Sequence, residues 1–353
     1  MPLAESPPHS VCLLRLSAIG DTFHVVPVLR TLQRAWPQTR FTWVIGKLEA
    51  KIMTQIPEVE FVVLDKQDLG QAYRTLRAAM RGRRFDVLMH MQLALRASVL
   101  ATLIPARVRL GFDFKRAREL QWMFTNQQIQ PAQRQHVLDS LFGFAEAFRV
   151  YEKVLRWDIP LPQAARDYAQ RLVPEGTPTM IISPCSSHAL RNWRPEYYAA
   201  VADYAIATLG LKVVLCGGRS EIERRMGEEI CGRMRERCEN NIGKDTLLEL
   251  LATLEQATLL LAPDSGPAHM ASAVGVPCVG LYAATNPARS GPYLSRQWCV
   301  DKYDVAARRL LGKPAHELPW TTKIERPGVM DLITPEEVIR KLHSVLLSLS
   351  RRR

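Results

Sequence analysis

Short apolar runs alternate with helix-like segments through both halves of the chain, and this alternation constrains the fold more than any other feature. The runs are residues 11–16, 41–45, 61–64 and 87–90 in the first half, and residues 180–183, 213–216, 259–262 and 276–282 in the second. Strands separated by helices favour parallel sheets with helices on their faces. The pattern breaks at Asp158-Ile159-Pro160-Leu161-Pro162, which is typical of a linker. The sequence therefore predicts an α/β protein with two Rossmann-like domains.

The length of the chain also favours two domains. At 353 residues it exceeds the size at which a single hydrophobic core usually stops growing. We expect a first domain at residues 1–165, a second at residues 166–333 and a terminal segment at residues 334–353. The terminal segment begins with Thr-Pro-Glu-Glu, which predicts an N-cap, a proline at the first helical position and acids in the first turn of an amphipathic helix.

The positive charge of the chain indicates an anionic partner. The formal net charge is +12, and residues 70–120 hold eleven Lys or Arg against three acids, so the excess is concentrated in the first half. A phosphorylated lipid at an anionic membrane face would account for this excess. Nucleic acid is the alternative, but no helix-turn-helix, zinc finger or aromatic RNA-binding motif accompanies the charge, so we expect no nucleic-acid partner.

No membrane-spanning or targeting segment is recognisable. No window reaches about 18 consecutive apolar residues, and residues 1–10 lack the basic-then-apolar order of a signal peptide. The seven cysteines form no C-x-x-C pair, which argues against a zinc site, and their odd number argues against a complete set of disulfides. We therefore expect a soluble, cytoplasmic protein with reduced thiols.

A phosphate-binding corner is predicted in the second half. Residues 264–269, Asp-Ser-Gly-Pro-Ala-His, directly follow an apolar run and precede a helix of small residues. The free N–H groups at the start of such a helix favour an anion, and Gly266 lets a ligand approach the backbone. Asp264 and His269 would then lie close to the anion. The alternative is that Asp264 or Ser265 is a plain N-cap, which is common before helices.

A second corner of the same kind opens the chain. Residues 11–16 predict a buried strand, residues 17–20 a turn, and Asp21 the start of a helix. The turn follows the carboxyl end of the first strand, where open α/β sheets place their ligands. The spacing matches neither G-x-G-x-x-G nor the Walker A motif, so neither dinucleotide binding nor a P-loop is favoured. For Asp21, too, a helix N-cap is the alternative.

Together the two corners resemble the signatures of the lipopolysaccharide heptosyltransferases, glycosyltransferase family 9. Residues 14–21, Leu-Arg-Leu-Ser-Ala-Ile-Gly-Asp, are similar to the amino-terminal signature of that family, and residues 264–269 to its carboxyl-terminal signature. Similar residues in between extend the resemblance from about Val11 to Tyr293. It implies the GT-B architecture, two Rossmann-like domains facing a central cleft. A terminal helix often packs back on the first domain in this architecture, and we expect the same of residues 334–353.

The resemblance also implies a reaction and a catalytic base. The reaction would be an inverting transfer of heptose from ADP-heptose to a Kdo-containing lipopolysaccharide inner-core acceptor of the Kdo-lipid A type. The enzyme would be peripheral at the cytoplasmic face of the inner membrane. The family assigns its base to the aspartate of the first signature, which is Asp21 here. A carboxylate on a rigid strand-to-helix turn can take the proton of an acceptor hydroxyl.

Donor-binding residues are predicted after several strands of the second half. Hydroxyls and a guanidinium can hold a diphosphate, the arginine through paired donors. The segment after residues 180–183 resembles the family's hydroxyl pair, spacer, basic residue and tryptophan, although Arg191 replaces a frequent lysine. By resemblance Glu221 would bind the ribose hydroxyls, with a first-turn helix acid as the alternative. The expected donor site consists of Ser186, Ser187, Arg191, Glu221, Asp264, Ser265, Gly266 and His269.

Basic residues of the first half are candidates for the acceptor site. Their charge suits the carboxylates and phosphates of an inner-core lipid. His24, one helical turn beyond Asp21, could assist, with a packed core histidine as the alternative. The expected acceptor site consists of His24, Arg96, Lys115, Arg116 and Arg118. No D-x-D pair lies near the donor corner, so we expect neither a metal nor another cofactor, with Arg191 and a helix dipole in place of the cation.

Three other functions remain open from the sequence. A glycosyltransferase of the same fold could use another nucleotide sugar or a protein acceptor, because sugar identity depends on a few hydroxyl contacts. A non-catalytic nucleotide-sugar-binding protein would have the same fold if Asp21 only capped its helix. A nucleic-acid-binding protein would show steeply salt-dependent DNA binding without a nucleotide preference.

Overall fold

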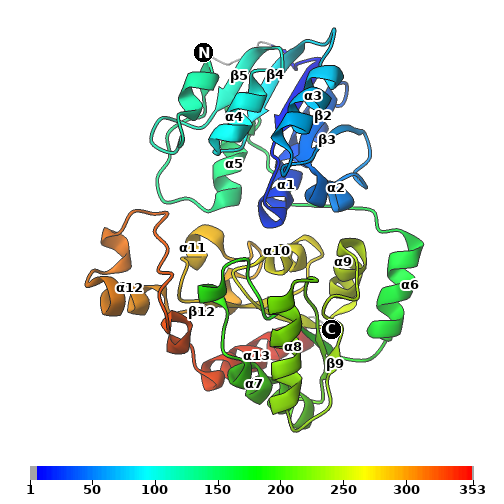
Figure 1. The fold of residues 1–353 in the computed structure, drawn as a ribbon, viewed down its shortest axis with the longest axis vertical. Helices are drawn as coiled ribbons and strands as arrows, with labels where there is room; N and C mark the ends of the chain where they lie inside the picture. The colour runs from blue at the N-terminus through cyan, green and yellow to red at the C-terminus, as the bar shows by residue number, and fades with distance from the viewer. Residues whose placement is uncertain (1–5, 352–353) are drawn as a thin grey trace. The chain divides into compact units, whose positions relative to one another are not determined.

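The computed structural model describes residues 6–351 and divides the chain into two units, Met1–Pro160 and Leu161–Arg353 (Figure 1). Each unit contains a six-stranded parallel sheet covered by helices. The α/β fold class predicted from the alternating apolar runs is therefore confirmed. Within the described residues, no helix is both long enough and apolar enough to cross a membrane.

The first unit has the strand order β3-β2-β1-β4-β5-β6, and neighbouring strands are parallel. The strands are β1 Ser10–Leu14, β2 Arg40–Gly46, β3 Val59–Leu64, β4 Phe85–His90, β5 Ala106–Gly111 and β6 Gln127–Gln128. The helices are α1 Ile19–Ala35, α2 Lys47–Met53, α3 Leu69–Ala79, α4 Leu95–Ala101, the 3-10 helix η1 Gln121–Phe124, and α5 Val137–Glu146.

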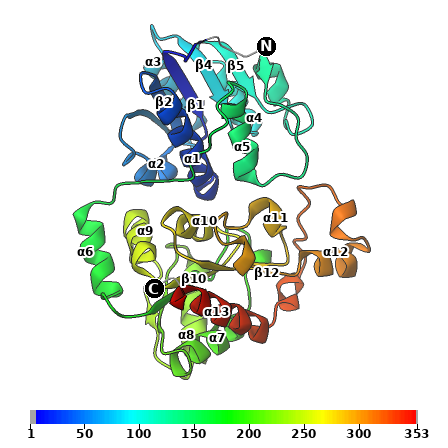
Figure 2. The ribbon, with the colours of Figure 1, turned by 180° about the vertical axis from the view of Figure 1, so that it is seen from behind.

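The central strand β1 carries the core of the first unit. Cys12 and Leu14 point to the face that α3 and α4 cover, where Leu76 and Leu100 join the same apolar cluster. Because side chains alternate along a strand, Leu13 points to the opposite face, where α1 and α5 pack against each other (Figure 2). Strand β1 is thus buried on both faces, which explains why its sequence is a continuous apolar run.

The second unit repeats this topology. Its order, β12-β11-β10-β7-β8-β9, equals that of the first sheet when strands are counted within the unit, and neighbouring strands are again parallel. The strands are β7 Thr179–Ile182, β8 Lys212–Leu215, β9 Glu239–Asn240, β10 Leu259–Pro263, β11 Cys278–Tyr282 and β12 Val300–Asp301. The α-helices are α6 Gln163–Leu172, α7 Pro195–Ala207, α8 Glu221–Arg233, α9 Leu247–Gln256, α10 Gly266–Ala273, α11 Pro287–Ser290, α12 Tyr303–Leu311 and α13 Pro335–Ser350. The 3-10 helices are η2 Ala189–Arg191, η3 Arg296–Trp298, η4 Ala315–Glu317 and η5 Val329–Leu332.

Both sheets have a topological switch point between the first and the fourth strand of the unit. The switch points lie between β1 and β4 and between β7 and β10. Connections leave such a point in opposite directions, so the loops at the carboxyl ends of the two strands form a crevice suited to ligands. Residues 15–21 follow β1 and residues 264–269 follow β10. Both corners predicted from the sequence therefore lie at switch points.

Helix α13 belongs to the second unit. Its predicted start is confirmed, since Thr334 is the N-cap residue and its N–H donates to Oε2 of Glu337 at 3.2 Å. Its apolar stripe, Val338, Leu342 and Val345, is buried in the core that also contains α7 and β11. The stripe is therefore covered by the second unit itself, and the expectation that this helix packs on the first domain stays a prediction.

All eight predicted strands are present, with ends shifted by one or two residues. The sequence missed β5, β6, β9 and β12, which lie toward the sheet edges and are too short or too polar to form apolar runs. In β5, Arg109 donates to the backbone carbonyls of Ile104 and Ala101, both at 2.8 Å. An arginine in this strand is therefore satisfied inside the unit, which its residue type does not reveal.

Replacing Leu342 by Ala should lower the free energy of unfolding by about 2–5 kcal/mol, because it leaves a cavity in the core of the second unit. Urea denaturation followed by circular dichroism measures this change. Leu347→Ala, on the same helix but 60% exposed, is the matched control and should change the free energy by less than about 0.5 kcal/mol. Equal effects of the two substitutions would contradict the placement of α13.

Candidate active site

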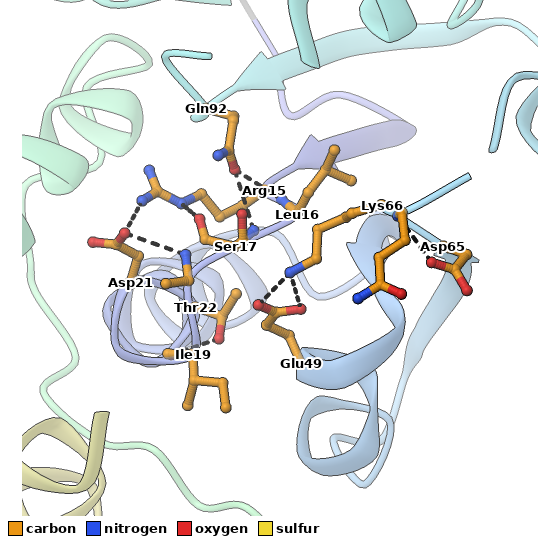
Figure 3. A network of polar contacts seen from close by, with 12 residues as sticks. Arg15, Leu16, Ser17, Ile19, Asp21, Thr22, Glu49, Asp65, Lys66 and Gln92 are labelled. Carbon is orange, nitrogen blue, oxygen red and sulfur yellow. Dashed lines mark hydrogen bonds and ion pairs between the residues drawn. The ribbon is translucent and has the colours of Figure 1, made fainter. Parts of the chain in front are cut away.

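The turn after β1 is fastened across the first switch point by a glutamine. Residues 15–18 connect β1 to α1, and Gln92 follows β4 (Figure 3). Its Oε1 accepts hydrogen bonds from the backbone N–H groups of Leu16 at 3.0 Å and Ser17 at 3.3 Å. Buried backbone donors need such partners, so Gln92 fixes the start of α1 relative to the sheet.

Arg15 organises the same turn from inside. Its guanidinium donates to the carbonyls of Ser17 at 2.9 Å and Met91 at 2.5 Å, and its Nη2 lies 2.5 Å from Oδ2 of Asp21 (Figure 3). The sequence did not single out Arg15 as a site residue. The available signal was an arginine inside an otherwise apolar strand run, which must find partners when it is buried.

Asp21 is held in place but stays open to solvent. Its Oδ2, besides pairing with Arg15, accepts from the backbone N–H of Ala18 at 3.3 Å. Its side chain is 38% exposed, whereas that of Arg15 is 10% exposed. Asp21 is the third residue of α1 and Ala18 is the N-cap residue, so Asp21 is not the N-cap itself. A carboxylate that is both oriented and accessible is what a general base requires.

A glycine allows β2 to approach this turn. The N–H of Gly46 donates to the carbonyl of Leu16 at 3.1 Å. A Cβ at this position would lie 2.4 Å from the same oxygen, so a larger residue would displace the turn. Nearby, the buried carboxylate of Glu49 pairs with Nζ of Lys66 at 2.7 Å (Figure 3).

His24 lies in the interior instead of at an accessible acceptor site. It is 3% exposed, and its ring packs edge-on against that of His136, with 5.3 Å between the centroids. His136 caps α5, since its Nδ1 accepts from the N–H of Leu138 at 3.1 Å. In the structure the residue packs α1 against α5, and its expected contact with an acceptor stays a prediction.

Another histidine, His90, ends β4 at the switch point. Burial lowers the pKa of His90 to about 3, and the positive charges of Arg109 and Arg15 act in the same direction. Its Nε2 lies 2.9 Å from Oγ of Ser98. This lowered pKa favours the neutral imidazole of His90 at physiological pH.

Arg116 is an internal anchor. Its guanidinium pairs with Asp113 and donates to Oγ of Ser140 at 2.9 Å, to Oε1 of Gln135 at 3.1 Å and to the carbonyl of Gln130 at 2.5 Å. These groups engage its donors inside the unit, and the expectation that Arg116 binds an acceptor stays a prediction. The sequence could not show this, since the partners lie 14 to 24 residues further along the chain, apart from Asp113.

The other basic candidates of the first unit remain accessible. Arg96, Lys115 and Arg118 are exposed. Lys115 also lines a pocket of about 420 Å³ together with Phe114 and residues 128–131. A second pocket, of about 850 Å³, opens at the amino ends of β2 and β4, where Arg83 and Glu60 form an ion pair at 2.5 Å. We place no ligand there, because α/β sheets bind ligands at the carboxyl ends of their strands.

In the second unit, a serine connects the loops across the switch point. Ser186, after β7, donates from Oγ to the carbonyl of Asp264, after β10, at 2.9 Å. The N–H of Ser186 donates to Oδ1 of Asn192 at 2.7 Å. This serine therefore has the same structural task in the second unit as Gln92 in the first.

Arg191 and Asp264 form the charged centre of this corner. Their closest charged atoms are 3.5 Å apart, and Arg191 also donates to Oε1 of Glu325 from Nη2 at 2.6 Å and from Nε at 2.9 Å. Partial burial alone would raise the pKa of Glu325, but the hydrogen bond and charge of Arg191 lower it below its ordinary value. Ser290 donates to Oδ2 of Asp264 at 3.4 Å. The two carboxylates hold the guanidinium, which is 13% exposed, in one position.

The start of α10 presents polar groups that other residues do not use. Ser265 is the N-cap residue, but its side chain makes no capping bond, and Gly266 is the first helical residue. Among the described residues, neither Oγ of Ser265 nor Oγ1 of Thr285 has a hydrogen-bond partner, although both atoms are buried. Ser265 thus occupies the N-cap position without capping the helix through its side chain. Buried hydroxyls left in this way suit a ligand.

The remaining donor candidates fall into two groups. Ser187 is exposed beside Ser186, and His269 is buried one turn into α10. Glu221 is not brought to this cluster: its carboxylate pairs with Arg224 and Arg225 on the surface of α8, both at 2.7 Å. The acid that reaches back to the Gly217-Gly218 turn is Glu223, whose Oε1 accepts from the N–H of Gly218 at 2.8 Å. Glu221 lies in the first turn of α8, as the alternative expected, and its binding of ribose hydroxyls stays a prediction.

Glu325 is the main contributor that the sequence did not indicate. It lies 134 residues after Arg191, in a segment without any predicted site residue. The preceding residue, Ile324, is buried, and its N–H donates to the carbonyl of Ala284 at 2.8 Å. This contact places Glu325 next to the donor corner. Trp193, the tryptophan of the same segment, is buried, and its Nε1 donates to the carbonyl of Ile333 at 3.0 Å.

Known proteins identify what kind of enzyme carries these corners. The sequence model of glycosyltransferase family 9 (heptosyltransferase) matches residues 73–320. The chain belongs to this family. The lipopolysaccharide core heptosyltransferase OpsX of Haemophilus influenzae is 37% identical to it over 342 residues, which cover 97% of this chain and 98% of that protein. The molecule is therefore a glycosyltransferase.

Solved structures of this family share the fold. A family 9 glycosyl transferase from Veillonella parvula superposes with a TM-score of 0.79 at 24% identity, covering 99% of both chains. The heptosyltransferase WaaC of Escherichia coli, solved with ADP, superposes with a TM-score of 0.72 at 19% identity, covering 95% of this chain and 99% of that one. These likenesses confirm the GT-B architecture. In the part of this glycosyltransferase that the structure describes, no group of three or more His, Cys, Asp or Glu is arranged to hold a metal.

Arg116→Gln should destabilise the glycosyltransferase by about 3–5 kcal/mol, because it leaves the carboxylate of Asp113, 3% exposed, without its counter-charge. Urea denaturation measures the loss. The neighbouring exposed Lys115→Gln is the matched control, expected within about 0.5 kcal/mol of the original chain. A normal stability of the Arg116 variant would remove its anchoring role.

Proposed function

We propose that this glycosyltransferase transfers heptose from ADP-heptose to a Kdo-containing inner-core acceptor of lipopolysaccharide, with inversion at the anomeric carbon. Its relative OpsX is named a lipopolysaccharide core heptosyltransferase, and WaaC was solved with ADP. The observation that carries the proposal is the oriented, solvent-accessible carboxylate of Asp21, paired with Arg15 at the first switch point. Arg96, Lys115 and Arg118 would attract the carboxylates and phosphates of the acceptor, and the enzyme would act as a peripheral protein at the cytoplasmic face of the inner membrane.

The diphosphate of the donor would bind at the corner formed by residues 264–269. The free N–H groups and the positive dipole end of α10 favour an anion there. The hydroxyls of Ser265 and Thr285 can donate to phosphate oxygens, as can the guanidinium of Arg191. Ser187 and His269 would complete the phosphate surroundings, and Asp264 would accept from sugar hydroxyls.

The proposed reaction needs one base and one stabilised leaving group. The oxygen of the acceptor hydroxyl attacks the anomeric carbon while its proton passes to the carboxylate of Asp21. The bond from that carbon to the diphosphate oxygen breaks, and the electron pair leaves with ADP. Arg191 and the N–H groups of α10 stabilise the charge that develops on the leaving group, in the place where other transferases use a metal ion.

A transfer assay tests the whole proposal. Deacylated inner-core acceptors with one or two Kdo sugars, with and without phosphate, are incubated with ADP-heptose and EDTA and followed by mass spectrometry. We expect a mass gain of one heptose on one of them. ADP binding without a mass gain would point to another sugar or to a protein acceptor, and absence of ADP binding would contradict the donor corner.

Asp21→Asn should lower kcat by roughly 10²–10⁴-fold, because the amide cannot accept the proton, while ADP affinity stays unchanged. Single-turnover kinetics and calorimetric titration with ADP separate the two effects. The control is Asp68→Asn: Asp68 caps α3 by accepting from the N–H of Gln71 at 2.8 Å, and its variant should retain transfer. Full activity of the Asp21 variant would leave this residue a capping role only.

A further inference from the structure

A patch of apolar side chains stands exposed on the first unit, beside the accessible basic residues. The 3-10 helix η1 contacts α4, and the rings of Phe114 and Trp122 lie 5.9 Å apart. The exposed fractions of the patch residues range from 42% to 68%. We call the following residues the apolar patch: Leu95, Val99, Phe114, Leu120, Trp122 and Met123. An exposed cluster of this kind indicates an interaction site more often than chance exposure.

Buried hydrogen bonds hold the segment that carries the apolar patch against the rest of the first unit. Gln121, between the exposed Leu120 and Trp122, is fully buried. Its Nε2 donates to the carbonyls of His90 at 2.8 Å and Gln92 at 3.0 Å. Its Oε1 accepts from the N–H of Phe112 at 3.1 Å. Leu120 has a φ of 60°, a left-handed conformation that a bulky side chain adopts only under constraint. These hydrogen bonds and this backbone conformation therefore keep the side chains of the apolar patch exposed to solvent.

The charge around the patch is positive. Residues 95–123 contain six Lys or Arg and two acids. Both acids are engaged within the segment: Asp113 pairs with Arg116, and Glu119 accepts from the N–H of Leu95 at 2.6 Å. Exposed lysine and arginine next to exposed tryptophan, phenylalanine and leucine is the combination that binds anionic lipid interfaces.

We propose that the apolar patch inserts into the interface of an anionic lipid bilayer, with Arg96 and Lys115 contacting lipid headgroups. Trp122 and Phe114 would lie at the level of the headgroups, where amphipathic and aromatic rings are favoured. A second copy of this chain is a poorer partner, because a symmetric contact would bring the same cationic residues of both copies together. The inference rests on the peripheral membrane placement in the proposed function and not on which sugar the enzyme transfers.

Co-sedimentation with lipid vesicles tests this docking surface. The full chain is mixed with vesicles of phosphatidylcholine containing about one third phosphatidylglycerol, and with vesicles of phosphatidylcholine alone. We expect binding to the anionic vesicles, weakened by raising the salt from about 50 to 500 mM. The double variant Phe114→Ala/Trp122→Ala should bind them about tenfold or more weakly. Ile222→Ala, an equally exposed apolar residue on α8, is the matched control and should bind like the original chain.

Two further measurements make the outcome decisive. Circular dichroism melts should show that the double variant folds as the original chain does, since both side chains are exposed. The difference between the tryptophan fluorescence spectra of the original chain and of Trp122→Phe reports on Trp122. The emission maximum of this difference should shift to shorter wavelength when anionic vesicles are added. Equal vesicle binding by the original chain and the double variant, or no binding at all, would overturn the proposal. So would concentration-dependent self-association that the double variant abolishes, since a second copy would then cover the patch.

Discussion

In each sheet one polar side chain closes the gap at the switch point, and both corners depend on it. In the first unit Gln92 accepts from two backbone N–H groups of the turn after β1, and in the second Ser186 donates to the carbonyl of Asp264. Where neighbouring strands send their connections in opposite directions, the loop backbones cannot satisfy each other along a continuous ladder. The side chain that satisfies them also determines where the next residues of the loop lie.

An arginine paired with an aspartate follows from this arrangement in both units, but the two pairs differ in exposure. The carboxylate of Asp21 is 38% exposed, whereas that of Asp264 is 12% exposed. An accessible carboxylate can exchange a proton with a bound molecule. An enclosed one mainly holds its guanidinium, which keeps a positive charge oriented before any anion arrives. An Arg–Asp pair thus suits two different tasks, proton exchange or holding a guanidinium. The exposed fraction of the carboxylate distinguishes them.

The sequence predicted what local pattern determines. Central strands such as β1 and β10 are buried on both faces and form continuous apolar runs. Asp264 directly follows β10, and Asp21 lies in the first turn of the helix after β1. The short or polar strands toward the edges, among them β5 and β9, lack that pattern. Tertiary partners decided the rest: Arg116 and His24 have residue types that suit an acceptor, yet contacts with distant segments use them internally. Glu325 reaches Arg191 only because a buried isoleucine returns its segment to the corner.

The position of α13 determines the order in which the molecule can be built during translation. Its stripe shares one core with β7, so Met180 and Val345 complete the same apolar cluster although the other five strands of the second sheet are synthesised between them. The first unit closes its sheet within its first 160 residues and can fold while the ribosome is still making the second. Until α13 emerges, the nascent second unit exposes the apolar surface that this helix covers, which makes it a substrate for chaperones that bind such surfaces.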